Sequence, residues 1–155
     1  MKDDTTRAPA TPGLSGIERQ RETVAGRREG PGIWKVLGFR LEAVSEGQAH
    51  LLAEPRPEMC NSNGTVHGGW YGTLLDSCMA CAIGSKLAAG QGSTTLEYKV
   101  NILRSIPMGR VVRATGTAQH VGRSSGVAVG EVRDVETGQL YATGSTTCMV
   151  FTPKP

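Results

Sequence analysis

Residues 68–89 read GGWYGTLLDSCMACAIGSKLAA, and this stretch decides the fold. Apolar or small side chains occupy nearly every side of a helix built from it, so other elements should surround the helix. The one charged residue between residues 68 and 85 is Asp76. Burial of a carboxylate in an apolar helix is costly unless the carboxylate is paired or hydrogen-bonded. Asp76 therefore either serves a function, or faces a wet groove or accepts a structural hydrogen bond, and this feature alone leaves both interpretations open.

The sequence on either side of the helix predicts strands. Residues 34–44 have a strand-like composition, Glu46 and Gly47 form a turn, and residues 49–53 return as a second strand. Four more strand candidates follow the helix, separated by glycine-containing turns, at residues 94–103, 111–121, 126–134 and 140–151. This order predicts an α+β fold in which an antiparallel sheet wraps around one long central helix.

The length of 155 residues suits one domain of ordinary size. The chain has 17 Lys and Arg against 14 Asp and Glu, a net charge of +3, and it contains no run of five like charges. We therefore expect no nucleic-acid partner. Residues 1–31 are rich in Arg, Glu, Pro and Gly and predict a flexible or partly helical extension, with a short polar helix within residues 16–28. Residues 32–155 form the predicted domain.

The expected location is the cytoplasm. The first twenty residues contain acidic side chains and no apolar run of a secretory signal, and we expect no membrane segment. The cysteines are at positions 60, 78, 81 and 148. Cys78 and Cys81 have a spacing that suits a metal or redox pair, but no other Cys or His completes a zinc set. We interpret them as small buried residues of the helix and expect no metal.

The helix begins after His67, at Gly68 and Gly69. The first amides of a helix have no intrahelical partner and lie at the positive end of its dipole. Glycine lets a ligand oxygen approach the backbone closely, so this terminus could polarise a carbonyl as an oxyanion hole does. Taken alone, the two glycines indicate only a flexible start of the helix.

Asp76 comes eight residues after Gly68, which corresponds to about 12 Å along one helix. One small reacting group cannot touch both residues over that separation. A site that uses both needs the start of the helix from one subunit and the aspartate from another. The sequence therefore implies a symmetric dimer if the site is real.

Four segments together resemble the acyl-CoA thioesterases of the hotdog fold, and most closely the phenylacetic-acid-degradation (PaaI) branch. They are NSNGTVHGG at residues 61–69, LLD at 74–76, TTLEYKVN at 94–101 and VGRS at 121–124. The likeness covers about residues 33–151, and the motifs are specific as a set. It implies the hotdog fold, in which an antiparallel sheet wraps around a long helix and two protomers lie side by side.

The resemblance also implies catalytic roles. Asp76 would be the general base that activates water, or the nucleophile that forms a mixed anhydride. The Gly68 amide would bind the thioester oxygen, and Asn61 would donate a second hydrogen bond to it. His67 would lie beside the leaving sulfur, although a His at such a junction is as often a structural cap. Thr95 would face Asp76 across the dimer and help hold the attacking water.

For the nucleotide end of coenzyme A, the resemblance points to the turn residues Arg123 and Ser124, with Arg104 as a second candidate. Arginine suits phosphate, although a single Arg in a turn is more often solvated. Trp70 and Tyr71, just inside the start of the helix, could line a pocket for an aryl group or pack in the core.

We therefore expect an enzyme that hydrolyses an acyl-CoA or aryl-CoA thioester, with coenzyme A as part of the substrate and no separate cofactor. The expected assembly is a dimer, with a tetramer of paired dimers beyond it. The alternative is a non-catalytic module of the same fold that binds a CoA ester or another hydrophobic ligand. The Asp-x-Asn-Pro…His pattern of the hotdog dehydratases is not found.

Overall fold

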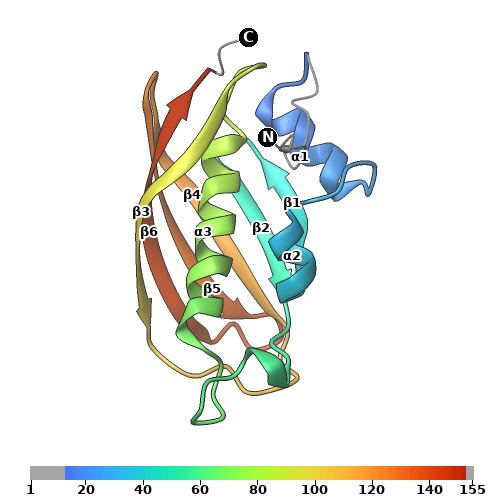
Figure 1. Ribbon diagram of the computed structural model, residues 1–155, viewed down its shortest axis with the longest axis vertical. Helices are drawn as coiled ribbons and strands as arrows, with labels where there is room; N and C mark the ends of the chain where they lie inside the picture. The colour runs from blue at the N-terminus through green and yellow to red at the C-terminus, as the bar shows by residue number, and fades with distance from the viewer. Residues whose placement is uncertain (1–12, 153–155) are drawn as a thin grey trace, which may run out of the picture.

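Six strands form one antiparallel sheet (Figure 1). The computed structural model describes residues 13–152. The strands are β1 (Phe39–Ser45), β2 (Gln48–Ala53), β3 (Gly92–Ile102), β4 (Val112–Val121), β5 (Ser125–Asp134) and β6 (Leu140–Phe151). Their order is β1-β2-β4-β5-β6-β3, so β1 and β3 are the edges of the sheet. The antiparallel sheet predicted from the sequence is confirmed.

The long helix α3 (Gly68–Gly84) lies against the concave face of the sheet, as Figure 1 shows. Its side chains without exposed surface include Leu74, Leu75, Met79 and Ile83. Burial of a side chain of this size stabilises the fold by about 2 kcal/mol. Glycine allows the sheet to come close to the helix: a Cβ on Gly116 of β4 would overlap the backbone carbonyl of Cys78. The central helix predicted from the sequence is confirmed.

The helix ends earlier than predicted, at Gly84 instead of residue 89. Ser85 follows it, and the Ser85 hydroxyl donates to the carbonyl of Ala82 at 2.7 Å. The same hydroxyl accepts a 2.7 Å hydrogen bond from the amide of Gly47, in the turn between β1 and β2. Because this side chain ties the end of the helix to that turn, the chain leaves the helix axis there.

The strand predicted over residues 34–44 is wrong in its first part. Residues Gly32–Leu37 form the short helix α2, and β1 begins only at Phe39. Gly38, with φ of 75°, ends α2 in the left-handed conformation that glycine adopts without strain. The buried Trp34 anchors α2 by donating from its indole nitrogen to the Ser77 hydroxyl of α3 at 3.0 Å. This tertiary contact overrides the strand propensity of the segment.

The other five strands begin and end within two residues of their predicted positions. Turns separate β1 from β2 and β5 from β6, where Gly47 and Gly138 take φ values of 79° and 72°. Along β5, every second side chain is buried in the direction of α3. The strands and turns after residue 45 are therefore confirmed.

The N-terminal segment packs against the end of α3. Helix α1 (Gly16–Val24) lies beside the C-terminal end of α3 in Figure 1, and the amide of Gly16 donates to the carbonyl of Leu87 at 2.9 Å. A Cβ on Gly16 would overlap the backbone carbonyl of Gly84. The short predicted helix is confirmed, whereas residues 1–12 of the predicted extension lie outside the described residues. The domain boundary at residue 31 stays a prediction.

Candidate functional site

Asp76 lies in the middle of α3, half-buried, where β3 passes the helix. Its Oδ1 accepts a 2.7 Å hydrogen bond from the hydroxyl of Thr95 on β3. Within residues 13–152, no residue forms a hydrogen bond with its second oxygen, Oδ2. One carboxylate oxygen is therefore held in place and the other is available to a ligand or to water.

Thr95 contacts Asp76 of its own chain, which corrects the expectation that it lies opposite Asp76 across a dimer. The Thr95 hydroxyl also lies 3.8 Å from the thiol of Cys148 on β6. Because Thr95 gives its one proton to Asp76, the Cys148 thiol is the donor in the second contact. The sequence did not indicate Cys148, because its place opposite Thr95 depends on the register of β3 against β6, which is shifted by a bulge between Thr95 and Glu97.

The other titratable groups near Asp76 on α3 are thiols. Burial, and to a smaller extent the Asp76 carboxylate, raises the pKa of Cys81 to about 12. Burial likewise raises the pKa of Cys78 far above its usual range. Both thiols stay protonated at neutral pH and are poor nucleophiles. Asp76 is therefore the group on this face of the helix that can act as a base or nucleophile.

The N-terminal end of α3 is capped by His67, whose Nδ1 accepts a 2.9 Å hydrogen bond from the amide of Gly69. This contact gives His67 the capping role that the sequence left as an alternative. The amide of Gly68 is exposed, and within residues 13–152 it has no hydrogen-bond acceptor. It is a free donor at the positive end of the helix dipole.

Asn61 organises the loop before this helix end. Its Oδ1 accepts from the amide of Asn63 at 2.9 Å, and its Nδ2 donates to the hydroxyl of Thr65 at 3.0 Å. The side-chain amide has two N–H groups, so one remains for a ligand. Asn61 and Gly68 thus lie near the start of α3, and about 12 Å of helix separates Gly68 from Asp76.

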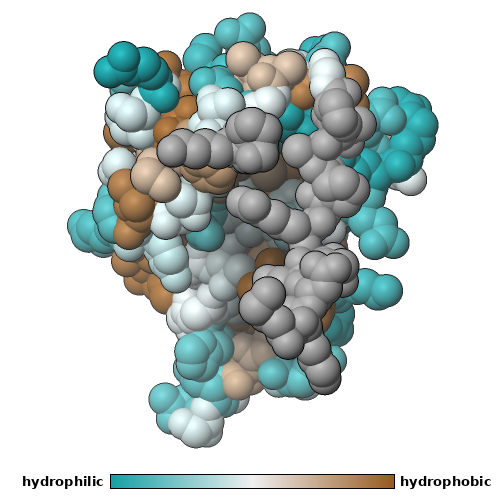
Figure 2. Space-filling view, turned by 45° about the horizontal axis from the view of Figure 1, so that its top comes forward, coloured by the Kyte–Doolittle hydropathy of each residue, from teal (hydrophilic) through white to brown (hydrophobic). Residues whose placement is uncertain are grey.

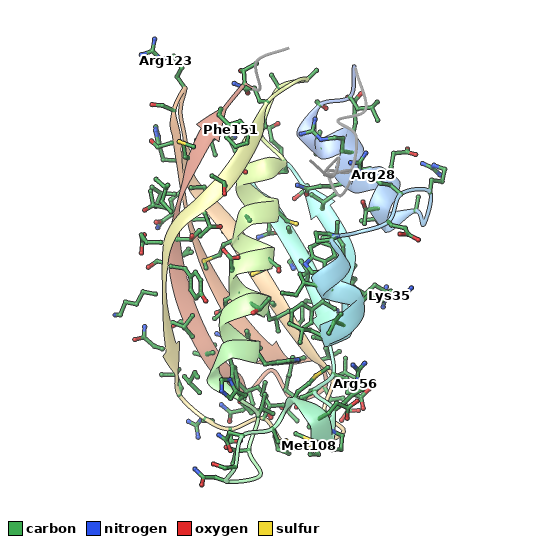
Figure 3. All side chains as sticks on the ribbon, viewed as in Figure 1. Arg28, Lys35, Arg56, Met108, Arg123 and Phe151 are labelled. Carbon is green, nitrogen blue, oxygen red and sulfur yellow. The ribbon has the colours of Figure 1, made fainter. Side chains whose placement is uncertain are left out.

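The structure does not bring the predicted coenzyme A residues together within one chain. Arg104 is exposed just after β3, at the end of the sheet where α3 begins. Arg123 and Ser124 are exposed in the turn between β4 and β5. Figure 3 shows Arg123 at the opposite end of the molecule from Met108. Within one chain, Arg104 therefore lies at a different end of the sheet from Arg123 and Ser124.

Trp70 and Tyr71 belong to the core. Trp70 is 3% exposed and packs edge-on against Phe39, with ring centroids 5.4 Å apart. Tyr71 is 1% exposed, and its hydroxyl accepts a 2.9 Å hydrogen bond from the amide of Ile106. Of the two alternatives, core packing is the one that the structure shows.

A cavity of about 350 Å³ opens beside Asp76. One wall is a single face of α3, which includes Asp76, Ala80 and Gly84 at intervals of four residues. The opposite wall comes from the N-terminal segment, with Gln20 of α1 and Trp34 of α2. The N-terminal segment therefore takes part in the surroundings of Asp76, which the sequence did not indicate.

Residues 13–152 show no disulfide, no metal-binding cluster and no membrane-crossing helix. All four cysteines are free thiols. No group of three or more His, Cys, Asp or Glu side chains in this part of the chain is placed to hold a metal ion. Nor does any helix described here have the length and apolar character of a membrane-crossing segment.

Comparison with known families identifies the family of this chain. The sequence model of the Thioesterase superfamily matches residues 63–141, just over half of the chain, from the loop before α3 into β6. The chain belongs to the thioesterase superfamily. This superfamily member is 35% identical over 82 residues to an uncharacterized acyl-CoA thioester hydrolase of Haemophilus influenzae, and the match covers 52% of each protein. The chain spans about half the length of the curated relatives it matches.

Solved structures share the fold over most of this chain. A phenylacetic acid degradation-related protein of Ralstonia eutropha is 27% identical, with a TM-score of 0.76 over 84% of this chain and 98% of that protein. The PaaI protein from the phenylacetic acid degradation operon of E. coli has a TM-score of 0.77 at 22% identity, over 88% of this chain and 96% of that one. At that identity the second likeness concerns the fold alone. The expected hotdog fold is confirmed.

Proposed function

We propose that this thioesterase-superfamily chain hydrolyses an acyl-CoA or aryl-CoA thioester to a free acid and coenzyme A. The observation that carries the proposal is the half-buried Asp76 carboxylate, held by Thr95 at 2.7 Å and open to a cavity. The name of the Haemophilus influenzae relative supports the same class of reaction. The reaction uses water, one carboxylate and backbone amides, and it requires no separate cofactor.

Two routes use the same residues. In the first, Asp76 takes a proton from water while the water oxygen attacks the thioester carbon and the thiolate of coenzyme A leaves. In the second, the carboxylate itself attacks this carbon and expels the thiolate, and water then hydrolyses the mixed anhydride. In both routes the carbonyl oxygen gains negative charge, and the Gly68 amide of a second copy, at the positive end of its α3, stabilises that charge.

The remaining residues of the proposed site assist binding and orientation. Asn61 supplies the second hydrogen bond to the thioester oxygen through its free N–H, and the uncapped side of the His67 ring faces the leaving sulfur. Arg123, Ser124 and Arg104 are assigned to the nucleotide end of coenzyme A, with contributions from both chains. All four cysteines are free thiols, which suits a reducing compartment, and we place the reaction in the cytoplasm.

A dimer through β3 would complete the site. This edge strand is 11 residues long and, within residues 13–152, has no neighbouring strand on one side. Such edges readily pair with another chain. Leu96 is 63% exposed on it, and Tyr98 and Ile102 are each 47% exposed. Figure 2 shows apolar side chains on the side of the molecule where β3 lies in Figure 1. Pairing of β3 with β3 of a second copy would place Asp76 of one copy near Gly68 of the other.

A charge on this edge should break the dimer. Leu96→Glu places like charges opposite or near one another across the proposed interface, so we expect the particle mass in light scattering to fall from that of a dimer to that of a monomer. Val36, on α2, is 67% exposed and serves as the matched position. Val36→Glu should leave the mass unchanged. A dimer that survives Leu96→Glu would place the interface elsewhere.

Thr95→Val should lower kcat by about tenfold to a hundredfold, because a hydrogen bond to a charged group contributes about 1.5–3 kcal/mol. The valine keeps the shape of the side chain but leaves Asp76 without its donor. Thr95→Ser keeps the hydroxyl and should retain most of the activity. Release of free thiol, measured with a thiol-reactive dye, gives both rates. Equal rates for Thr95→Val and the unaltered chain would show that the contact has no catalytic role.

The same dye assay tests the proposed function itself. The purified chain is given straight-chain CoA esters of increasing length, phenylacetyl-CoA and hydroxybenzoyl-CoA. Turnover of at least one ester is the expected result. A folded protein that binds these esters in calorimetry but releases no thiol would instead be a non-catalytic binding module.

A further inference from the structure

Gln20 contains a buried acceptor without a donor. Its Oε1 is the one buried side-chain oxygen or nitrogen within residues 13–152 that has no hydrogen-bond partner. Gln20 lies on α1 and lines the cavity that opens beside Asp76. A buried carbonyl oxygen without a donor is costly, so such a group in a cavity marks the place where a ligand supplies the donor.

The hydrogen bond made by the amide nitrogen of Gln20 sets the orientation of its side chain. Gln20 Nε2 donates to the backbone carbonyl of Cys81 on α3 at 2.9 Å. A carbonyl accepts only from a donor, so the NH₂ group must face Cys81 and the oxygen must point away from it. The side chain therefore presents a fixed acceptor, which could not become a donor without losing its bond to α3.

Two glycines hold Gln20 at this place. A Cβ on Gly84 would come within 2.8 Å of Gln20 Nε2, and a Cβ on Gly16 would overlap the carbonyl of Gly84. Only residues without side chains allow α1 to approach α3 so closely. The position of Gln20 at the cavity is thus set by the packing of two helices.

The cavity connects Gln20 with the reacting centre. Asp76 and Cys81 are five residues apart on α3, which corresponds to about 7.5 Å along the axis. Between them the cavity is lined by Ser77 and Ala80 of α3 and, opposite, by Ile33 and Trp34 of α2. The Ser77 hydroxyl already accepts a hydrogen bond from the Trp34 indole. A thioester carbon at Asp76 would therefore leave room for a short chain or a single ring that ends at Gln20.

We propose that Gln20 determines the substrate specificity of this site, by accepting a hydrogen bond from a neutral hydroxyl at the far end of the acyl group. The inference rests on the proposed thioester hydrolysis and adds the chemistry of the acyl group. An acceptor disfavours a terminal carboxylate, which has no proton to give at neutral pH. A terminal ammonium is disfavoured by Arg19, a cation that lines the same cavity and donates to the backbone carbonyls of Leu14 and Gln91.

The test compares kcat/KM for hexanoyl-CoA, its ω-hydroxy analogue and its ω-carboxy analogue. For the unaltered chain we expect about a tenfold preference for the hydroxylated ester, the value of one net hydrogen bond. Gln20→Met keeps the length of the side chain without the amide, and it should remove this preference while hexanoyl-CoA is still turned over. Arg21→Met introduces the same methionine at an exposed position of α1, and this variant should retain the preference for the hydroxylated ester. Unfolding temperatures verify that all variants fold.

Three results would overturn the inference: equal kcat/KM for the hydroxylated and plain esters, a preference that survives Gln20→Met, or a preference for the carboxylated ester. Calorimetry on Asp76→Asn gives a second readout that needs no turnover, since the ratio of the Kd values of the plain and hydroxylated esters should show the same preference, again lost with Gln20→Met. Failure of the thioesterase proposal is recognised separately. In that case the unaltered chain cleaves none of the esters in the panel, and the Kd ratio alone decides the role of Gln20.

Discussion

Asp76→Asn is expected to lower kcat for CoA thioester hydrolysis about a thousandfold, the typical contribution of a positioned general base. The asparagine amide can neither take a proton from water nor attack a thioester carbon. Its Oδ1 can still accept from the Thr95 hydroxyl, so the contact between α3 and β3 survives. We therefore expect the unfolding temperature to remain close to that of the unaltered chain, and thiol release to report the chemistry alone.

The matched control is Glu54→Gln, the same exchange of carboxylate for amide on an exposed residue that directly follows β2 and lies outside the proposed interface. It should hydrolyse esters at the rate of the unaltered chain. Thiol release by Asp76→Asn at that same rate would remove Asp76 from the reaction. A loss of activity in both variants would point to a general effect of charge on substrate binding.

Gly116→Ala should destabilise the fold by about 3 kcal/mol, at the upper end of the range for overpacked cores. The added Cβ would overlap the carbonyl of Cys78 and lie 2.8 Å from the amide of Met79. Both groups belong to the backbone of α3, which cannot turn aside as a flexible side chain does. The helix and the sheet must separate, and the unfolding temperature should fall by about 10 °C.

Gly32→Ala is the control for this exchange. Gly32 begins α2, and a Cβ there meets no atom within 4 Å. The free energy of unfolding of the Gly32→Ala variant should differ from that of the unaltered chain by about 0.5 kcal/mol or less. If calorimetry gives Gly116→Ala the same stability as Gly32→Ala, the close approach of β4 to α3 is not needed for the fold.

The sequence predicted the repetitive parts of the fold well. Six strands, a central helix and their antiparallel arrangement could be inferred because side-chain patterns repeat with the period of each element. The segment before residue 39 was different. Its apolar residues are too few to separate a strand from a helix, and the hydrogen bond between Trp34 and Ser77 of α3 made it the helix α2.

For the candidate site, sequence reasoning identified Asp76 as a lone carboxylate in an apolar helix and Gly68 as the free amide at the start of that helix. It placed Thr95 across a dimer, whereas the structure joins Thr95 to Asp76 within one chain. It had no signal for Cys148 or Gln20. Both residues reach the surroundings of Asp76 only through contacts between segments that are far apart in the sequence.

By itself, the sequence determined the six strands, the central helix and the separation of Gly68 from Asp76, because these depend on periodicity and on the rise of one helix. It also determined which residues could act as base and as hydrogen-bond donor. Only the tertiary structure decided what lies beside Asp76. Thr95 contacts the carboxylate at the place where β3 has a bulge, and the contact between Gly16 and Gly84 brings Gln20 to the cavity. Register and close helix packing are properties of two segments at once, so a pattern read along one segment cannot contain them.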